Sequence, residues 1–333
     1  MRHQRLLKAI VFCTVVVLAT QVSAQPTRRG GLWGDWIVKS EFNGRQMESI
    51  LSFSRDQEGN QTGQWISFWG LSELKDLKYE EGKLSFARVR QNREGQPITS
   101  TFKGTIAEGK LSGLVSSDQR EYALEGQRAP RMPRAVGIWE MKSKREDREF
   151  TSTLTVKVDK EGALTAQWKS ERGEPKITDV QYSRGKLTFK MQSSNPDRQW
   201  EAAFEGTLQQ DGLAGVMKSE RGEMTVEGKR AGAALMGTWN LEITSDRGTR
   251  QQRLRINPDM SGLYGSAPVE KVNIKDDQVD FKITLKFGDR EFEMSFQGKI
   301  EESKLVGEMT TSMGEMKITG TKVIRRSRRR GTM

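Results

Sequence analysis

Hydrophobic and polar residues alternate along most of this chain. Leu154, Val156 and Val158 alternate with polar residues, and the same period of two recurs in many short runs. Strict alternation over about four to eight residues is typical of a strand that buries one face. Turn-forming segments such as Asp-Lys-Glu-Gly at 159–162 separate the runs. No window has the spacing of an amphipathic helix, so the pattern predicts an all-β protein.

The alternating pattern occurs three times along the chain. Each copy opens with a Gly-x-Trp motif, at Gly34–Trp36, Gly137–Trp139 and Gly237–Trp239. Each copy closes on a basic residue that follows a Gly-x pair, at Arg128, Arg230 and Lys322. A repeat of this length is the first feature to recognise, because it decides the fold. The copies are long enough for each to bury a core of its own.

Each copy contains eight alternating runs, joined by loops short enough for antiparallel hairpins. An antiparallel meander of this number can close into an up-and-down barrel, which leaves no exposed edge strand. Two packed sheets fit the alternation almost as well. Because the hairpin spacing gives no sign of a long crossover, we expect three tandem antiparallel up-and-down barrels, each eight-stranded.

The repeat boundaries divide the chain into five parts. We expect a signal segment at 1–24, barrels at 32–128, 135–230 and 235–324, and a basic disordered tail at 325–333. The third copy is shorter, with 42 residues from Trp239 to Phe281 against 50 from Trp36 to Phe86. The missing residues fall between Gly262 and Phe281, which predicts a shortened strand pair there. What all copies keep is assigned to the fold, and what one copy alone carries is a candidate for function.

The opening Gly-x-Trp and the basic residue that ends each copy resemble the calycin superfamily of lipocalins and avidins. In that superfamily the Trp packs at the closed end of the barrel and a basic side chain from the last strand lies across it. The resemblance implies three pairs that close the barrels: Trp36 with Arg128, Trp139 with Arg230, and Trp239 with Lys322. A cation over an indole face, with its stem covering apolar surface, gives such a pair a physical basis.

The first 24 residues have the features of an export signal. A basic start precedes the apolar run Ala9–Ala19, and Val22–Ala24 forms a cleavage site of small residues. The apolar run is too short to span a membrane comfortably. Cys13 and His3, the one cysteine and the one histidine of the chain, both lie in this segment. We therefore expect a secreted or periplasmic mature protein without cysteine, histidine or a transmembrane segment.

The lack of cysteine and histidine after the signal segment excludes several classes of chemistry. Disulfides, zinc sites of cysteine or histidine, and nucleophile pairs that need histidine are all impossible there. Paired carboxylates can hydrolyse glycosides, but no pair of acids stands out. Asp76 and Asp179 occupy equivalent positions, for which we expect a turn or surface role. The sequence thus predicts no catalytic residue, no metal and no cofactor.

The basic charge is concentrated at the ends of the chain. The formal net charge is +11, and removing three signal charges and five tail arginines leaves 11 − 3 − 5 = +3 for the barrels. The tail arginines are Arg325, Arg326, Arg328, Arg329 and Arg330. This tail fits an anionic envelope surface or an acidic polysaccharide, or it is a solvated disordered end. Without interleaved aromatic residues it cannot read a nucleic-acid sequence.

Three aromatic residues of the first copy have no counterpart in the others. Phe68 and Trp69 lie in a hairpin where the second copy carries Glu171 and Arg172, and Trp33 precedes the first barrel alone. A Trp at a barrel rim can stack on a sugar ring or pack against a neighbouring barrel. These residues are the ligand-binding candidates, with packing as the alternative.

The sequence favours a non-catalytic binding or structural module of the cell envelope. Its partners would be a small ligand or a polysaccharide, and an anionic envelope surface through the tail. The alternative is a carrier that holds a small apolar or sugar-like ligand inside the barrels. A membrane β-barrel fits less well, because spanning strands need about 9–11 residues and most of these runs are shorter.

Overall fold

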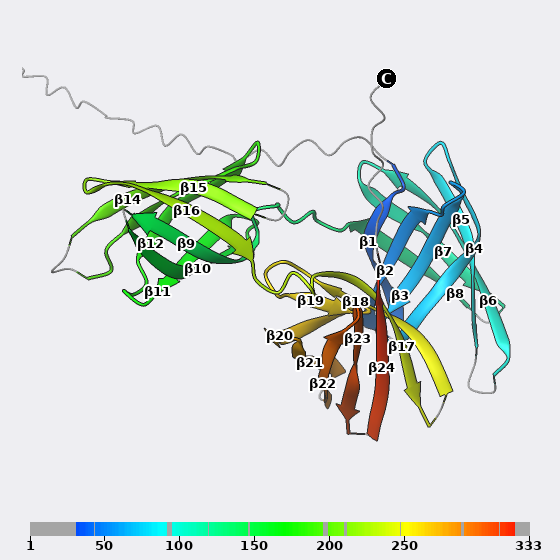
Figure 1. The fold of residues 1–333 in the computed structure, drawn as a ribbon. Helices are drawn as coiled ribbons and strands as arrows, with labels where there is room; N and C mark the ends of the chain where they lie inside the picture. The colour runs from blue at the N-terminus through cyan, green and yellow to red at the C-terminus, as the bar shows by residue number, and fades with distance from the viewer. Residues whose placement is uncertain are drawn as a thin grey trace, which may run out of the picture.

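The computed structural model describes residues 31–323, apart from 43, 92–94, 119, 146, 196–198, 210–211, 247, 288–289 and 313. The described residues form only strands, arranged in three successive eight-stranded antiparallel units (Figure 1). The predicted all-β fold of tandem barrels is therefore confirmed. The predicted signal segment at 1–24 and the tail Arg325–Arg330 lie outside the described residues.

The first and third units are closed barrels in which neighbouring strands follow the sequence order. The first consists of β1 (Gly34–Phe42), β2 (Arg45–Arg55), β3 (Gln61–Ser67), β4 (Gly70–Glu80), β5 (Lys83–Gln91), β6 (Pro97–Ala107), β7 (Lys110–Ser117) and β8 (Arg120–Arg128). The third consists of β17 (Gly237–Ser245), β18 (Gly248–Ile256), β19 (Gly262–Tyr264), β20 (Ala267–Lys275), β21 (Gln278–Phe287), β22 (Arg290–Glu301), β23 (Lys304–Thr311) and β24 (Gly314–Lys322). The residues missing from the third copy shorten β19, which has three residues against seven in β3.

The second unit has the same strand order with one open seam. It consists of β9 (Gly137–Arg145), β10 (Arg148–Val158), β11 (Leu164–Ser170), β12 (Lys176–Ser183), β13 (Lys186–Gln192), β14 (Glu201–Leu208), β15 (Gly212–Ser219) and β16 (Gly222–Arg230). Its sheet begins at β11 and ends at β12, so these two strands form no ladder. Pro175 stands where the first barrel has Ser72, which pairs with Trp65 of β3. Because proline has no N–H to donate, it interrupts the ladder at this point.

A β-bulge explains the repeated aspartate in the fourth strand of the first two barrels. The register shifts between Lys75 and Lys78 in the first barrel and between Thr178 and Gln181 in the second. Asp76 and Asp179, at φ of 52° and 57°, occupy the left-handed region that aspartate tolerates better than most residues. Both side chains are exposed, as a surface role requires.

Each barrel is sealed at the end where its first strand begins, by a fully buried tryptophan. The three indole N–H groups donate to the carbonyl four residues earlier: Trp36 to Leu32 at 2.9 Å, Trp139 to Ala135 at 3.0 Å, and Trp239 to Leu235 at 2.7 Å. A cation of the last strand lies over each ring: Arg128 at 4.7 Å, Arg230 at 4.1 Å and Lys322 at 5.4 Å from the ring centroid. The six residues thus form one cation–indole pair at the closed end of each barrel.

The same cations also hold the segment that leads into each barrel. Arg128 donates to the carbonyls of Gly31 and Trp33. Arg230 donates to the carbonyl of Val136 at 2.7 Å, and Lys322 to that of Ala234 at 2.7 Å. These bonds hold the lead-in segments against the closed ends of the barrels.

Stacked phenylalanines fill the middle of each barrel. The ring centroids lie 4.8 Å apart for Phe86 and Phe102, 4.7 Å for Phe189 and Phe204, and 4.7 Å for Phe281 and Phe296. The Phe102 ring lies flat over Gly104, where a Cβ atom would overlap it, and this explains why each copy keeps a glycine there. The interiors are therefore packed cores at this level.

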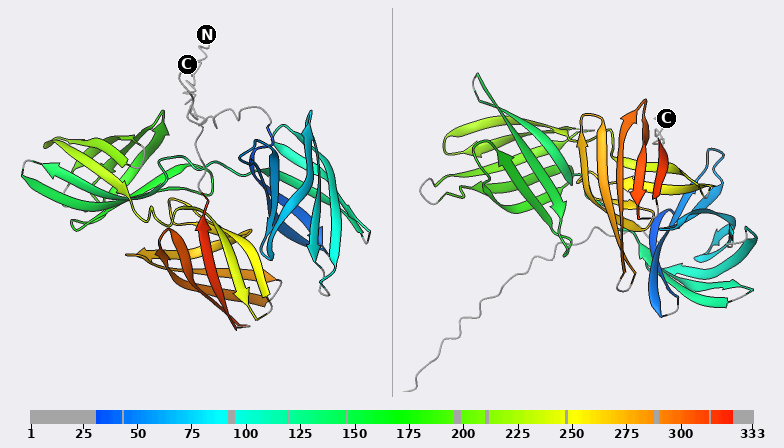
Figure 2. Two further views of the ribbon diagram at one scale, coloured as in Figure 1. Left: turned by 45° about the vertical axis from the view of Figure 1, so that its right-hand side comes forward. Right: turned by 90° about the horizontal axis from the view of Figure 1, so that it is seen from below.

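The third barrel lies between the other two, so the order in space differs from the order in sequence (Figure 2). It contacts the first barrel through β18 and β4. It contacts the second through a backbone hydrogen bond of 3.2 Å from Ile138 N–H to the carbonyl of Pro258. The first and third barrels are separated by the whole second copy in sequence and pack directly against each other in space.

Candidate functional site: the open end of the first barrel and its contact with the third

The three aromatic candidates of the first copy do not come together. Trp33 lies beside the closed end, partly buried against the first core, with the Arg55 guanidinium 4.4 Å from its ring centroid. Phe68 and Trp69 form the turn between β3 and β4. In the antiparallel register β3 begins at the closed end, so this turn lies at the opposite, open end.

Phe68 packs into the third barrel. The third barrel has only the short strand β19 at this point. The Phe68 ring packs against the core of the third barrel, with its centroid 6.2 Å from the Tyr264 ring centroid. Gly265, at φ of 62°, lies so close to the Ser67 carbonyl that a Cβ atom would overlap it. The turn between β3 and β4 of the first barrel therefore packs against the third barrel beside the shortened strand β19.

Polar groups of β18 hold the hairpin in place. The buried Gln252 side chain donates from Nε2 to the carbonyls of Ser67 at 3.0 Å and Phe68 at 2.9 Å. Arg250 donates to the carbonyl of Trp69 at 3.4 Å. The Trp69 ring meets Phe68 edge to face at 5.0 Å and is 59% exposed, so a ligand can still reach it.

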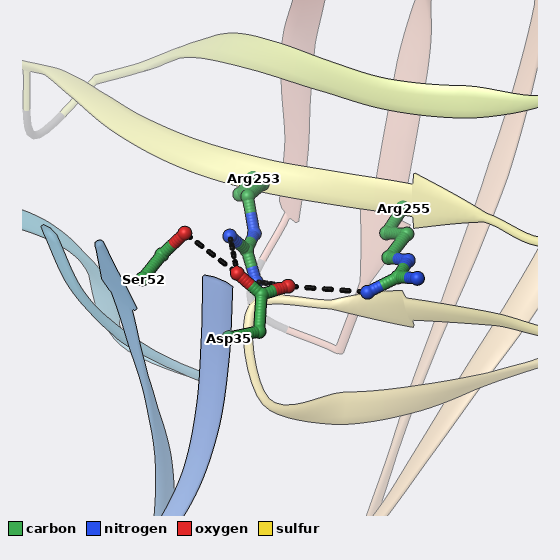
Figure 3. Close-up of polar contacts among 4 residues, drawn as sticks. All are labelled: Asp35, Ser52, Arg253 and Arg255. Atoms are coloured by element: carbon green, nitrogen blue, oxygen red, sulfur yellow. Dashed lines mark hydrogen bonds and ion pairs between the residues drawn. The ribbon is translucent and has the colours of Figure 1, made fainter. Parts of the chain in front are cut away.

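A buried carboxylate completes the contact between the two barrels (Figure 3). Asp35 accepts hydrogen bonds from Arg253 at 3.2 Å, from Arg255 at 3.1 Å and from Ser52 at 2.6 Å. The side chains of Asp35 and Arg253 are 10% and 5% exposed. Burial raises the pKa of Asp35, but Arg253, Ser52 and Arg255 outweigh it and hold the pKa below its ordinary value of 3.8. The carboxylate is ionised at neutral pH and joins β1 to β18.

Sequence reasoning did not find this ion cluster. Asp35 occupies the middle of the first Gly-x-Trp motif, where the other copies have Ile138 and Thr238. That difference marks it as copy-specific, which was the available signal. Nothing in the sequence indicated that its partners lie in the third copy.

Replacing Phe68 with alanine should destabilise the third barrel, although Phe68 belongs to the first. The change removes an aromatic side chain packed against the third core, for which we expect a loss of about 2–3 kcal/mol of unfolding free energy. Hydrogen exchange should rise in β18, β19 and β20. Trp69→Ala is the control, because its exposed ring should cost less than about 0.5 kcal/mol. Faster exchange confined to the first barrel would contradict the assignment.

On β5 the interior of the first barrel becomes polar toward the open end, at a position where the other two barrels are apolar. On β5 the inward-facing positions Leu84 and Phe86 are buried, and the next one is Arg88. The equivalent residues are Met191 in the second barrel and Ile283 in the third, both buried. The Arg88 guanidinium lies 4.5 Å from the Trp65 ring centroid. A cation thus stands where the other barrels extend their apolar cores.

The surroundings of Arg88 are polar as well. Its Nε–H donates to the Ser72 hydroxyl at 3.4 Å, and Ser100 lies opposite it in the register of β5 and β6. Burial lowers the pKa of Arg88 to about 10, Tyr122 opposes this shift, and Arg90 adds to it. Arg88 itself is half-buried, and Arg90 follows it two residues later on β5.

The same substitutions recur at neighbouring interior positions. Ser100 corresponds to Ala202 in the second barrel and Met294 in the third, and Tyr122 corresponds to Met224 and Met316. Aligning the inward-facing positions of the three copies would have revealed Arg88 from the sequence alone. The candidates chosen from the sequence are aromatic residues in loops, whereas Arg88 is a polar residue on a strand.

Within the described ranges, no helix has the length and hydropathy that a membrane crossing requires. In the same part of the chain, no three histidine, cysteine, aspartate or glutamate side chains gather as metal ligands.

No protein-family model matches the chain, and no curated protein matches it in sequence. Among solved structures, the chain is similar to a Bacteroides fragilis protein thought to belong to the outer membrane, at 12% identity over 59% of this chain and 96% of that one, with a TM-score of 0.23. It is also similar to transferrin-binding protein B of Haemophilus parasuis, at 10% identity over 88% of this chain and 76% of that one, with a TM-score of 0.22. Transferrin-binding protein B of Neisseria meningitidis is similar at 11% identity over 87% of this chain and 75% of that one, with a TM-score of 0.18. Similarities of this size carry no information on function.

Proposed function

We propose that this chain is an exported, non-catalytic binding protein of the cell envelope, whose first barrel holds a small ligand at its open end. The second and third barrels serve as scaffold. The observation that carries the proposal is the exchange of one interior position, Arg88 in the first barrel against Met191 and Ile283 in the others. A partly buried cation weakens a barrel core, whereas Met and Ile fill the same space without that penalty. Such a residue is best explained by a ligand.

The location within this proposal rests on the sequence. The apolar segment within 1–24 has the features of an export signal, and the Gly-x-Trp motifs with their closing basic residues resemble those of the calycin superfamily. The tail Arg325–Arg330 remains a predicted contact for an anionic envelope surface. The lack of histidine and cysteine after the signal supports a binding role over catalysis.

A carrier of an apolar ligand inside all three barrels is less well supported. Stacked phenylalanines occupy the middle of each barrel, and methionines extend the apolar core toward the open ends of the second and third. A sugar-like ligand remains compatible with the first barrel, because the exposed Trp69 ring lies at the same open end as Arg88.

The proposal is tested by native mass spectrometry of the full mature chain, purified gently from its own envelope. We expect a stoichiometric extra mass that is lost on denaturation. Ser100→Met, which gives the first barrel the residue of the third, should abolish that mass by filling the open end. Ala202→Met in the second barrel is the matched control and should retain it. An extra mass that survives Ser100→Met, or no extra mass at all, would overturn the assignment of the site.

A further inference from the structure

We infer that the ligand at the open end of the first barrel carries an oxyanion group (a carboxylate, phosphate or sulfate) that binds the guanidinium of Arg88. The inference rests on the binding function proposed above and adds the chemistry of the ligand. It follows from the charge around Arg88, from the state of its N–H donors and from the groups that surround it.

Arg88 has no acidic partner among the described residues. The ion pairs of the described chain are formed by other arginines and lysines, and none includes Arg88. The two side chains that act on its charge are Tyr122 and Arg90. Tyr122 is a phenol and not a carboxylate, and Arg90 is a second cation. The charge at this end of the barrel is therefore uncompensated by any described carboxylate.

Most N–H donors of Arg88 remain available. A guanidinium has five N–H donors, and one of them, on Nε, points to the Ser72 hydroxyl at the long distance of 3.4 Å. The buried side-chain atoms that lack a partner in the described chain are Gln61 Oε1 and the Tyr264 hydroxyl, and no nitrogen of Arg88 is among them. The terminal nitrogens are thus not fully buried, and no hydrogen bond within the described chain occupies them.

The surroundings suit an oxyanion more than a neutral ligand. A guanidinium binds two oxygens of a carboxylate, phosphate or sulfate through parallel N–H donors, and partial burial strengthens that bond. Trp65 supports one face of the guanidinium at 4.5 Å and fixes its orientation. The hydroxyls of Ser72 and Tyr122 lie nearby as further donors, and Arg90 adds positive potential.

Arg55 of the first barrel also contacts an aromatic ring, but it lies outside the barrel interior. Arg55 lies 4.4 Å from the Trp33 ring centroid, but it is exposed at the closed end. Its guanidinium donates to the Gly59 carbonyl at 2.6 Å. Arg55 is therefore a matched control, because it shares the ring contact and lacks the interior position.

The test measures binding of four probes to the full mature chain by calorimetry: sulfate, inorganic phosphate, octanoate and the neutral octyl glucoside. We expect at least one oxyanion to bind, more weakly as salt is added, and octyl glucoside not to compete. Arg88→Met should weaken that binding about 10- to 100-fold, the effect of losing hydrogen bonds to a charged group. Arg55→Met should leave it unchanged. Sulfate or phosphate binding would indicate a free anion, and binding of octanoate alone would indicate the head group of an amphiphile.

Two further results separate this inference from the proposed function. Arg88→Met should unfold at the same temperature as the unmodified protein or higher, since it copies Met191, so lost binding cannot be attributed to unfolding. Arg88→Lys keeps the charge without the planar fork and should bind with intermediate affinity. If Arg88→Met binds the probes as well as the unmodified protein, the inference of an oxyanion ligand is wrong, but the proposed binding site still stands. The same holds if the natural ligand is neutral and Ser100→Met excludes it. Failure of every probe, with no extra mass, would overturn both.

Discussion

Replacing Asp35 with alanine should separate the first barrel from the third. The change leaves Arg253, whose side chain is 5% exposed, buried against the first barrel without its carboxylate. Removing one partner of a buried ion pair costs about 3–5 kcal/mol. We expect this cost to exceed the free energy that holds the two barrels together. We expect a larger radius of gyration in small-angle scattering and faster hydrogen exchange in β18 and in the turn between β3 and β4.

The control for this prediction is an aspartate of the same chain whose ion pair is exposed. Asp179 pairs with Lys190 at 3.0 Å, with both side chains more than half exposed. Asp179→Ala should change stability by less than about 1 kcal/mol and leave the scattering profile as it was. If Asp35→Ala behaves like Asp179→Ala, the cluster does not hold the barrels together.

Acid should produce the same separation in the unmodified protein. The pKa of Asp35 is lowered in the folded state, so its contribution to stability is complete above the ordinary pKa of 3.8 and disappears as the pH falls through the lower folded value. Scattering from pH 7 down to pH 2 should therefore show the barrels opening only at the acidic end. Asp35→Ala should show no such step.

The alternating pattern predicted the fold because it reports directly on which side chains are buried. It predicted the three eight-stranded units, and the deletion in the third copy predicted a shortened strand pair, in which β19 is the strand most reduced. The open seam of the second barrel was not predicted, although Pro175 is visible in the sequence. A proline interrupts a ladder only if its N–H was needed, and that depends on the register of β11 and β12.

The sites were harder to predict, because a repeat alignment marks differences without showing which of them meet in space. Phe68 and Trp69 were recognised as specific to the first copy, but their partners lie about 180 residues away in β18. Asp35 and Arg253 each look like an ordinary outward-facing strand residue until the two barrels are packed together. Arg88 was within reach of the sequence, since the change from Leu84 and Phe86 to arginine on one face of β5 is visible from the alternation alone.

Replacing Trp139 with alanine should unfold the second barrel and leave the other two folded. Trp139 is fully buried, donates to the Ala135 carbonyl at 3.0 Å and lies under Arg230. Loss of such a side chain costs about 3–5 kcal/mol, and the open seam beside β11 leaves this barrel the fewest ladder bonds with which to compensate. Trypsin should cut within residues 137–230 while the fragments on either side stay intact.

Trp200 provides the comparison within the same barrel. Its side chain is 38% exposed and it lies in the loop before β14, so Trp200→Ala should cost less than about 1 kcal/mol and leave the trypsin pattern unchanged. Trp139→Phe keeps most of the buried area and loses the bond to the Ala135 carbonyl, so its cost should fall between the two, at about 1–3 kcal/mol. Cleavage spread evenly over all three barrels would mean that they fold as one unit. In that case the tryptophan at the closed end would stabilise all three barrels and not its own barrel alone.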